Sequence, residues 1–506
     1  MHHHTDPVVT TAQGAVRGLR QDDGTAAFLN IPYAAPPRGA DRFAPPRPHE
    51  PWDGVRDATV PGPNAPQSER RLGSVDMSSY FGTGWSRGED YLTVNVWTPA
   101  WAGNGLPVMV FVHGGGFVAG STRSALYDGS AFARDGVVLV TLNYRLGIAG
   151  FLDLPGAPAN RGLLDVVAAL RWVRENIAAF GGDPGAVTVF GQSAGATIVG
   201  GVLAAPDATG LFRRAIVQSG SGLGAFTSEQ AARVTRAAAE VLDVKPHADA
   251  FADIPDERLV EAASRLAGID LRTDTHHDPL LGLSPFSLVL DTQPAASVAA
   301  GAGAGAGVDL LVGTNSEEGN LYLVPVDKYA ASTAADVDDV ARLSHPDPAK
   351  LVEVYRVSRP GASFGELRSA ILGDALFGAG SRALADAHTA HPGSATFAYE
   401  FAWRSAALNG ELGATHAVEL PFVFDLAHLP QLQGPAALLG PDKPPARLAA
   451  RVHATWVRFA TTGRPGWDPY DTGRRATLRI DADSGTDTVG WAQVDDPRSE
   501  ERRAWA

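Results

Sequence analysis

The chain has 506 residues, of which 44% are hydrophobic, so it is long enough to bury a large core. Its 42 Lys and Arg against 56 Asp and Glu give a formal net charge of -14, which disfavours nucleic acid and other polyanionic partners. The absence of cysteine excludes disulfides, cysteine-based metal sites and a thiol nucleophile.

Residues 1–6 include His2, His3 and His4 and are predicted to be a tag-like or flexible tail rather than a metal site. Residues 7–506 are expected to form a single domain, since large α/β folds often run as one unit. No apolar run of signal-peptide length is found near the start, and nowhere do about 18 consecutive apolar residues occur. We therefore expect no membrane partner and a cytoplasmic location, with secretion left open. A monomer or a small homo-oligomer would fit, and the residues do not decide between them.

Residues 60–88 are rich in Pro, Gly, Ser and Arg and show little periodicity. This composition predicts a long surface loop. Because long structureless loops in compact domains are often functional, we expect this one to shape the mouth of a site.

Several short apolar runs, rich in β-branched residues, end in Gly, Asn or Ser. They predict strands over residues 108–113, 136–142, 187–190, 215–218 and 309–313. Continuous apolar runs of this length are typical of strands covered on both faces, as in a mostly parallel sheet.

Helical patterns fill the intervals between these runs. Apolar side chains recur at three- and four-residue steps over residues 163–180, and Gly181 stops the pattern. A second helix is expected near Thr227, which has capping-box spacing to Gln230. Strands that alternate with helices indicate the α/β doubly wound class. Residues 295–307 are rich in Ala and Gly and are expected to form a flexible loop.

The segment Gly191-Gln-Ser-Ala-Gly195 fits the pattern G-x-S-x-G between an expected strand and a helix expected over residues 196–205. A sharp turn from strand to helix leaves the serine hydroxyl clear at the C-terminal edge of the sheet, and only small residues fit two positions before and after it. The helix N-terminus favours negative charge on the adjacent oxygen. A glycine-rich turn with an N-capping serine is the alternative, which the flanking elements disfavour. We assign Ser193 as a nucleophile.

The segment His113-Gly-Gly-Gly-Phe117 follows another expected strand and matches the glycine-rich stretch of lipase and esterase oxyanion holes. Glycines let backbone N–H groups converge on one point without obstruction by Cβ. We expect the N–H groups of Gly115, Gly116 and Ala194 to bind an oxyanion. His113 is expected to be structural, because it lies at a strand end and not after the acid.

In this motif class the chain order is serine, acid, histidine, so the base must follow Ser193. The candidates are His247, His276, His277, His345, His388, His391, His416, His428 and His453. His416 differs from the others because it lies directly before an apolar segment. The acid should follow a strand, as Glu317 and Glu318 do, and the residues alone do not choose between these two.

Four segments carry a more specific pattern. They are EDYLTVNVW at 89–97, HGGGF at 113–117, FGQSAGA at 190–196 and LGATHAVELPF at 412–422. Together they resemble the type-B carboxylesterase family, which includes bacterial para-nitrobenzyl esterases and the cholinesterases. The similarity runs over nearly the whole chain, from Ile31 to Ala460, and looks closest to actinobacterial carboxylesterases.

The resemblance implies an α/β-hydrolase fold with a large, mostly parallel central β-sheet flanked by helices and a small N-terminal antiparallel β-sheet. The family's acid maps to Glu318 and its base to His416. A supporting serine maps to Ser219, which would form a hydrogen bond near the acid. Where the family often has Cys, this chain has Tyr91, so the loop disulfide of secreted members cannot form and the loop at 60–88 is expected to be more mobile.

The motifs and the resemblance predict a serine carboxylesterase that hydrolyses short- to medium-chain or aryl carboxylic esters through an acyl-enzyme. Its partner would be a small-molecule ester, and no metal or organic cofactor is needed. Phe117, Phe286, Leu288 and Phe422 are candidate walls of the substrate pocket. An unperturbed histidine has a pKa of about 6.5, so a histidine base predicts a kcat/KM that rises through roughly pH 6–7.

Two rival functions belong to other classes. One is an amide, carbamate or aromatic diester hydrolase on the same scaffold, which no feature of the sequence separates from an esterase. The other is a non-catalytic binding module, which this fold also supports. Such relatives typically lose the nucleophile, whereas Ser193, Glu318 and His416 are all present here.

Overall fold

A computed structural model describes residues 6–99, 105–482 and 490–506. The tail expected at residues 1–6 therefore lies outside the described residues, apart from Asp6. The strands are β1 (Val8–Thr11), β2 (Gly14–Arg17), β3 (Leu19–Arg20), β4 (Ala26–Pro32), β5 (Val55–Asp57), β6 (Thr93–Thr98), β7 (Leu106–Val112), β8 (Val138–Leu142), β9 (Gly182–Gln192), β10 (Arg214–Gln218), β11 (Asp309–Asn315), β12 (Thr396–Phe401), β13 (Ala476–Ile480) and β14 (Trp491–Asp495).

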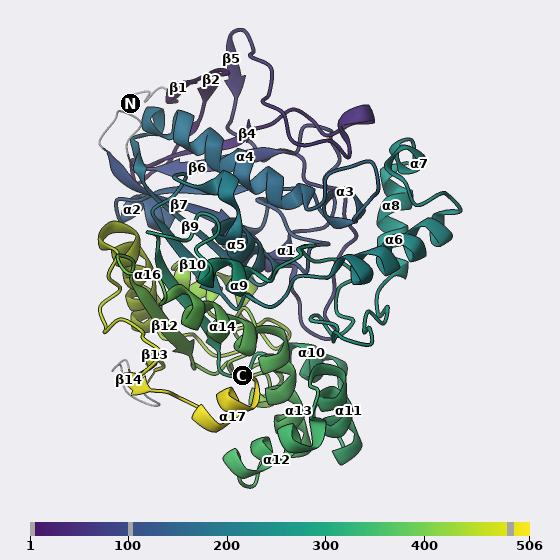
Figure 1. Cartoon of the computed structure of the whole chain (residues 1–506). Coiled ribbons are helices and arrows are strands. Elements are labelled where there is room, and N and C mark those ends of the chain that lie inside the picture. Colours follow the sequence, from purple (N-terminus) through teal and green to yellow (C-terminus); the bar gives the residue numbers. More distant parts are fainter. Residues whose placement is uncertain (1–5, 100–104, 483–489) are drawn as a thin grey trace.

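The helices surround these strands (Figure 1). They are α1 (Ser78–Phe81), α2 (Ser130–Arg134), α3 (Gly147–Phe151), α4 (Arg161–Asn176), α5 (Ala194–Ala204), α6 (Ser228–Leu242), α7 (Ala248–Ala252), α8 (Asp256–Arg265), α9 (Pro294–Ala299), α10 (Asn320–Leu323), α11 (Ala334–Ser344), α12 (Pro348–Ser358), α13 (Phe364–Gly373), α14 (Ala379–His388), α15 (Leu420–Val423), α16 (Ala446–Thr462) and α17 (Ser499–Ala504). None of the helices in the described part of the chain combines the length and apolar character needed to span a bilayer.

Within the described residues, the strands form one 11-stranded sheet and one 3-stranded sheet. The order in the large sheet is β14-β13-β12-β11-β10-β9-β7-β8-β6-β4-β3. Neighbours from β8 across to β13 pair in parallel, whereas the strands at both edges pair antiparallel. The small sheet is mixed rather than antiparallel, since β2 pairs antiparallel with β1 but parallel with β5.

Successive side chains of the central strands point to opposite faces, and both faces are buried. In β7, Val108, Val110 and Val112 join a core cluster that also contains residues of α4, α5 and α6. Met109 and Phe111 join a second cluster with residues of α2, α15 and α16. This two-sided burial explains why the strand sequences are continuous apolar runs.

The helices predicted from periodicity are present, and one predicted loop is partly wrong. The pattern over 163–180 corresponds to α4 and the short helix Ile177–Phe180, which ends at Gly181 with φ 89°. Thr227 and Gln230 form the expected capping box at the start of α6. The segment 295–307, expected to be a flexible loop, begins within α9, because Pro294 occupies the first helical turn and alanine favours helix.

The segment 60–88 is irregular apart from α1 and two isolated bridges, from Leu72 to Val75 and from Asp76 to Ala437. It is more than a surface loop, since Val75, Met77 and Tyr80 are buried. These side chains pack in the same core cluster as Met109 and Phe111 of β7, which places the segment on that face of the sheet.

Candidate active site

Ser193 lies on a sharp turn between β9 and α5. Its backbone has φ 57° and ψ -126°, a positive φ that side-chain-bearing residues rarely adopt. The Ser193 N–H donates to the Gln218 carbonyl at 2.9 Å, and Thr197 N–H donates to the Ser193 carbonyl at 2.9 Å. These bonds fix a strained turn at the end of a central strand, as the motif predicts.

The glycines on either side of Ser193 are required by close backbone packing. A Cβ at Gly191 would lie 2.6 Å from the Gly195 carbonyl carbon, and one at Gly195 would overlap the Val112 carbonyl oxygen of β7. Larger residues at either position would push α5 away from the sheet, so the spacing of the motif follows from this contact.

His416 and Glu318 line up behind the serine hydroxyl. His416 Nε2 is 2.8 Å from Ser193 Oγ, and His416 Nδ1 is 2.6 Å from Glu318 Oε2. The imidazole and the carboxylate are both buried, at 4% exposure each. Glu317 points elsewhere, to Arg404 and to the N–H of Ala414. The geometry therefore separates the two glutamates that the sequence left open.

Glu318 is held from two further sides. Ser219 Oγ donates to Glu318 Oε1 at 2.5 Å, and the Asn315 N–H donates to the same oxygen at 2.7 Å. The structure thus brings Ser219 against the acid, as expected. These two bonds hold Oε1, so the carboxylate presents Oε2 to the imidazole, its third hydrogen-bond partner.

A second buried carboxylate, which the sequence did not single out, lies behind Glu318. Glu419 Oε2 accepts from Asn315 Nδ2 at 2.7 Å, and Glu419 Oε1 accepts from Gln218 Nε2 at 3.2 Å. Burial, followed by the nearby charge of Glu318, raises the pKa of Glu419 to about 7. Asn315 therefore bridges two carboxylates.

Gly115, Gly116 and Ala194, whose N–H groups are expected to bind an oxyanion, line one cavity together with Ser193. Within the described hydrogen bonds, the N–H groups of Gly115 and Gly116 donate to no acceptor. Ala194 is the first residue of α5, so its N–H has no partner within the helix. Gly115 has φ 119° and Gly116 has φ 62°, and a Cβ at Gly115 would overlap the Ala119 carbonyl oxygen.

His113 belongs to the scaffold under this loop. Its ring stacks on Tyr144 with centroids 4.5 Å apart, and Nδ1 is 2.8 Å from the Gly114 carbonyl oxygen. Burial lowers the pKa of His113 to about 4, so the ring is neutral near pH 7.

A cavity of about 70 Å³ opens beside Ser193. Of the four expected wall residues, only Phe117 lines it. Phe286, Leu288 and Phe422 are instead core residues, at most 1% exposed, because the irregular segment before α9 and the short helix α15 bury them in the two core clusters. The walls that the sequence missed are Arg70, Leu72, Met77, Tyr80, Phe81, Gly114, Tyr127, Gln192, Thr197, Leu280, Leu283, Ser284, Leu321, Tyr322, Leu376, Phe377 and Ala417.

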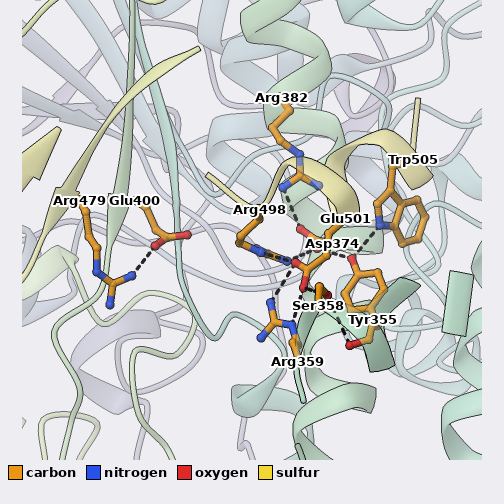
Figure 2. Close-up of polar contacts among 10 residues, drawn as sticks. All are labelled: Tyr355, Ser358, Arg359, Asp374, Arg382, Glu400, Arg479, Arg498, Glu501 and Trp505. Carbon is orange, nitrogen blue, oxygen red and sulfur yellow. Dashed lines mark hydrogen bonds and ion pairs between the residues drawn. The ribbon is translucent and has the colours of Figure 1, made fainter. Parts of the chain in front are cut away.

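Phe377 belongs to a π-helical turn, Asp374–Gly378, between α13 and α14. Its ring stacks on His416 with centroids 4.2 Å apart. Asp374, which begins the turn, is 2% exposed and accepts from Arg382 at 3.0 Å and from Arg498 and Tyr355. Figure 2 shows Asp374 enclosed by these side chains. A buried ionic network thus anchors the turn that faces the imidazole.

The same network ties the C-terminal helix to α12. Glu501 of α17 is 2.7 Å from Arg359 and also contacts Arg498, and the Trp505 indole N–H donates to the Tyr355 hydroxyl at 2.8 Å (Figure 2). Burial alone would raise the pKa of Asp374, but the guanidinium groups of Arg382 and Arg498 outweigh it and hold that pKa below its usual value. The carboxylate is therefore charged at neutral pH.

Comparisons with known proteins decide which family has this fold and site geometry. A sequence model described as the carboxylesterase family matches residues 5–499. The chain belongs to the carboxylesterase family. It is 36% identical over 513 residues to the para-nitrobenzyl esterase of Bacillus subtilis (strain 168), covering 99% of this chain and 98% of that protein.

Two further relatives agree with this. The chain is 34% identical over 470 residues to phenmedipham hydrolase of Pseudarthrobacter oxydans, covering 92% of each. A solved carboxylesterase from Geobacillus stearothermophilus superposes with a TM-score of 0.84 at 35% identity, covering 99% of this chain and 100% of that one. The α/β-hydrolase fold and the family predicted from the sequence are thereby confirmed, as is the general activity, hydrolysis of carboxylic esters by a serine esterase.

Proposed function

We propose that Ser193, His416 and Glu318 are the catalytic triad of this carboxylesterase. The observation that carries the proposal is the unbroken contact from Ser193 Oγ through the imidazole to Glu318 Oε2, at 2.8 and 2.6 Å. Nucleophile, base and orienting acid within hydrogen-bond reach of one another are the requirement for acyl transfer.

In the proposed cycle, His416 Nε2 takes the Ser193 proton while Oγ attacks the ester carbonyl carbon. The resulting oxyanion accepts from the N–H groups of Gly115, Gly116 and Ala194, each of which is worth on the order of 10²–10³ in rate. His416 then gives the proton to the departing alcohol, which leaves an acyl-enzyme. Water attacks that ester by the same route, which releases the acid and returns the proton to Oγ.

The substrates that fit best are short- to medium-chain or aryl carboxylic esters. The cavity beside Ser193 is small and its walls are mainly aromatic and aliphatic, with Tyr80, Phe117 and Phe377 among them. The likeness to a para-nitrobenzyl esterase supports aryl-bearing esters. Amide, carbamate and diester substrates are the second candidate, supported by the relative named phenmedipham hydrolase.

We further infer that residues 7–506 form one catalytic domain, which is supported by a single family model over 5–499. A cytoplasmic location and a monomer or small homo-oligomer stay predictions, for cell fractionation and for size-exclusion chromatography with light scattering to test.

The proposed triad is tested by covalent labelling together with kinetics. An aryl phosphonate should attach once per chain, on the peptide that contains Ser193, in the wild type and not in Ser193→Ala. The same substitution should abolish turnover of a panel of 4-nitrophenyl esters of increasing chain length and of matched anilides. Turnover retained by Ser193→Ala, or a label on another residue, would refute the assignment, and no labelling at all would favour a binding module.

A further inference from the structure

Arg70 is a cation at the wall of the proposed active site. It belongs to the irregular segment 60–88 and lines the cavity beside Ser193. Its Nη1 is 3.4 Å from the Gly115 carbonyl oxygen, and a Cβ built on Gly116 would lie 3.2 Å from the same nitrogen. The guanidinium therefore lies against the glycine loop whose N–H groups are proposed to bind the oxyanion.

Within the described residues, no carboxylate comes within ion-pair distance of Arg70. The neighbouring Glu69 pairs with Arg71 at 3.0 Å. Asp256, which lines the adjoining cavity, pairs with Arg42 at 3.3 Å. Arg70 instead has Phe81 beside it, with the guanidinium carbon 5.8 Å from the ring centroid. Partly buried arginines are normally paired, so a lone one in a cavity indicates a place for an anion.

The guanidinium also has donors to spare. Its contact with the Gly115 carbonyl is the one hydrogen bond of Arg70 within the described chain. The other guanidinium nitrogens have no partner among the described residues, yet they are not fully enclosed by protein atoms. They therefore face open space in the cavity. Arginine carries five N–H donors in a planar fork that matches a carboxylate, and it stays protonated at any working pH.

A second cavity adjoins the first at Arg70. It has a volume of about 220 Å³, and Arg70 and Leu283 line both spaces. Its other walls are largely aliphatic, from Val118, Ile148 and Val260. An ester that reaches Ser193 can thus extend past Arg70, and any charge on that extension would meet the guanidinium.

We propose that Arg70 binds a carboxylate carried by the substrate, so that the enzyme prefers half-esters of dicarboxylic acids to neutral esters of the same length. This inference rests on the proposed function, because it names the substrate class of the same site. The free carboxylate pairs with Arg70 while the ester carbonyl lies at Ser193. A neutral diester becomes such a half-ester after its first cleavage, so the second cleavage of a diester benefits from Arg70.

The test compares two aryl esters that differ in one group. In 4-nitrophenyl hydrogen adipate a carboxylate replaces the terminal methyl of 4-nitrophenyl hexanoate. The wild type should show a higher kcat/KM for the adipate, and the ratio of the two values should fall about 10- to 100-fold in Arg70→Gln, mainly through KM. Arg70→Lys should restore part of the ratio, because it keeps the charge but not the fork.

Arg71→Gln is the matched control, since Arg71 is exposed and already paired with Glu69; its ratio should stay at the wild-type value. Raising the salt concentration to about 0.5 M should also lower the wild-type ratio, a measurement that needs no variant to fold. An unchanged ratio in Arg70→Gln, or an equal fall for both esters, would overturn the proposal, because the latter means that Arg70 only supports the glycine loop. Turnover by Ser193→Ala would instead overturn the proposed triad. The ratio of kcat/KM values for the two esters would still test the role of Arg70 separately.

Discussion

The ring of Phe377 lies nearly parallel to the imidazole of His416, with centroids 4.2 Å apart and planes inclined by 12°. The stack fixes the tilt of the imidazole, which must point Nε2 at Ser193 Oγ and Nδ1 at Glu318. Replacing Phe377 by Ala removes that support and leaves a void beside the ring.

We therefore expect Phe377→Ala to lower kcat about 10- to 100-fold, with a smaller change in KM, since misplacing a reacting group costs mainly in the chemical step. Steady-state kinetics on 4-nitrophenyl hexanoate measure this. Phe364→Ala on the exposed side of α13 is the control, because Phe364 is 44% exposed. A kcat for Phe377→Ala that matches the control would mean that the imidazole is held by its hydrogen bonds alone.

Glu317 and Glu318 are adjacent in the chain, so substituting each in turn tests which of them is the acid of the triad. Glu318→Gln removes the charge that faces His416 Nδ1 and should lower kcat about 10³- to 10⁴-fold, because the imidazole then loses its orienting and stabilising partner. Glu317→Gln should change kcat little, since Glu317 contacts Arg404 and the Ala414 N–H rather than the imidazole. Comparable losses in both variants would point to a general disturbance of the loop.

The buried network around Asp374 predicts a large stability effect at a distance from the nucleophile. Asp374→Asn leaves the guanidinium group of Arg382 without its charge partner and that of Arg498 with Glu501 alone, in a largely buried place. Removing one partner of a buried ion pair typically costs about 3–5 kcal/mol. Glu500→Gln breaks only an exposed pair with Arg503 and should cost less than about 1 kcal/mol. Urea unfolding at neutral pH compares the two variants with the wild type, and similar midpoints for both would contradict the assigned role of the network.

The parts of this structure that the sequence predicts well are those fixed by local rules. Strand runs, the α6 capping box and the serine turn each follow from residues that are neighbours in the chain, and the structure contains all of them. The prediction of a loop over 295–307 was partly wrong, because it was based on the Ala and Gly content of the segment and did not weigh Pro294, a residue that favours the start of a helix.

What the sequence could not supply depends on segments that meet only in the folded chain. Phe422 and Phe377 are both aromatic residues in apolar surroundings, yet one packs in the core and the other faces the imidazole. Which side an apolar residue takes is decided by the element that covers it, and no local pattern encodes that. In the same way, the bridge by Asn315 joins residues about a hundred positions apart.

The raised pKa of Glu419 makes stability depend on pH in an unusual direction. Burial and the charge of Glu318 raise this pKa to about 7 in the folded state, whereas an unfolded glutamate titrates near 4.5. At a pH between these two pKa values, Glu419 holds a proton in the folded chain that it has lost in the unfolded chain. The free energy of unfolding therefore falls as pH rises. A shift of this size corresponds to a loss on the order of 3 kcal/mol, complete above about pH 7.

The glutamine side chain in Glu419→Gln cannot ionise, so the loss of stability with rising pH should vanish in the variant. The substitution also disturbs the hydrogen bonds to Asn315 and Gln218, but that cost does not titrate. The difference in Tm between Glu419→Gln and the wild type should therefore move in favour of the variant as pH rises from about 5 to 8. Glu411→Gln, at an exposed carboxylate, should show no such trend over the same range. If the Glu419→Gln difference stays constant with pH, then Glu419 is already ionised at pH 5, and its two amide donors stabilise the charge more than burial opposes it.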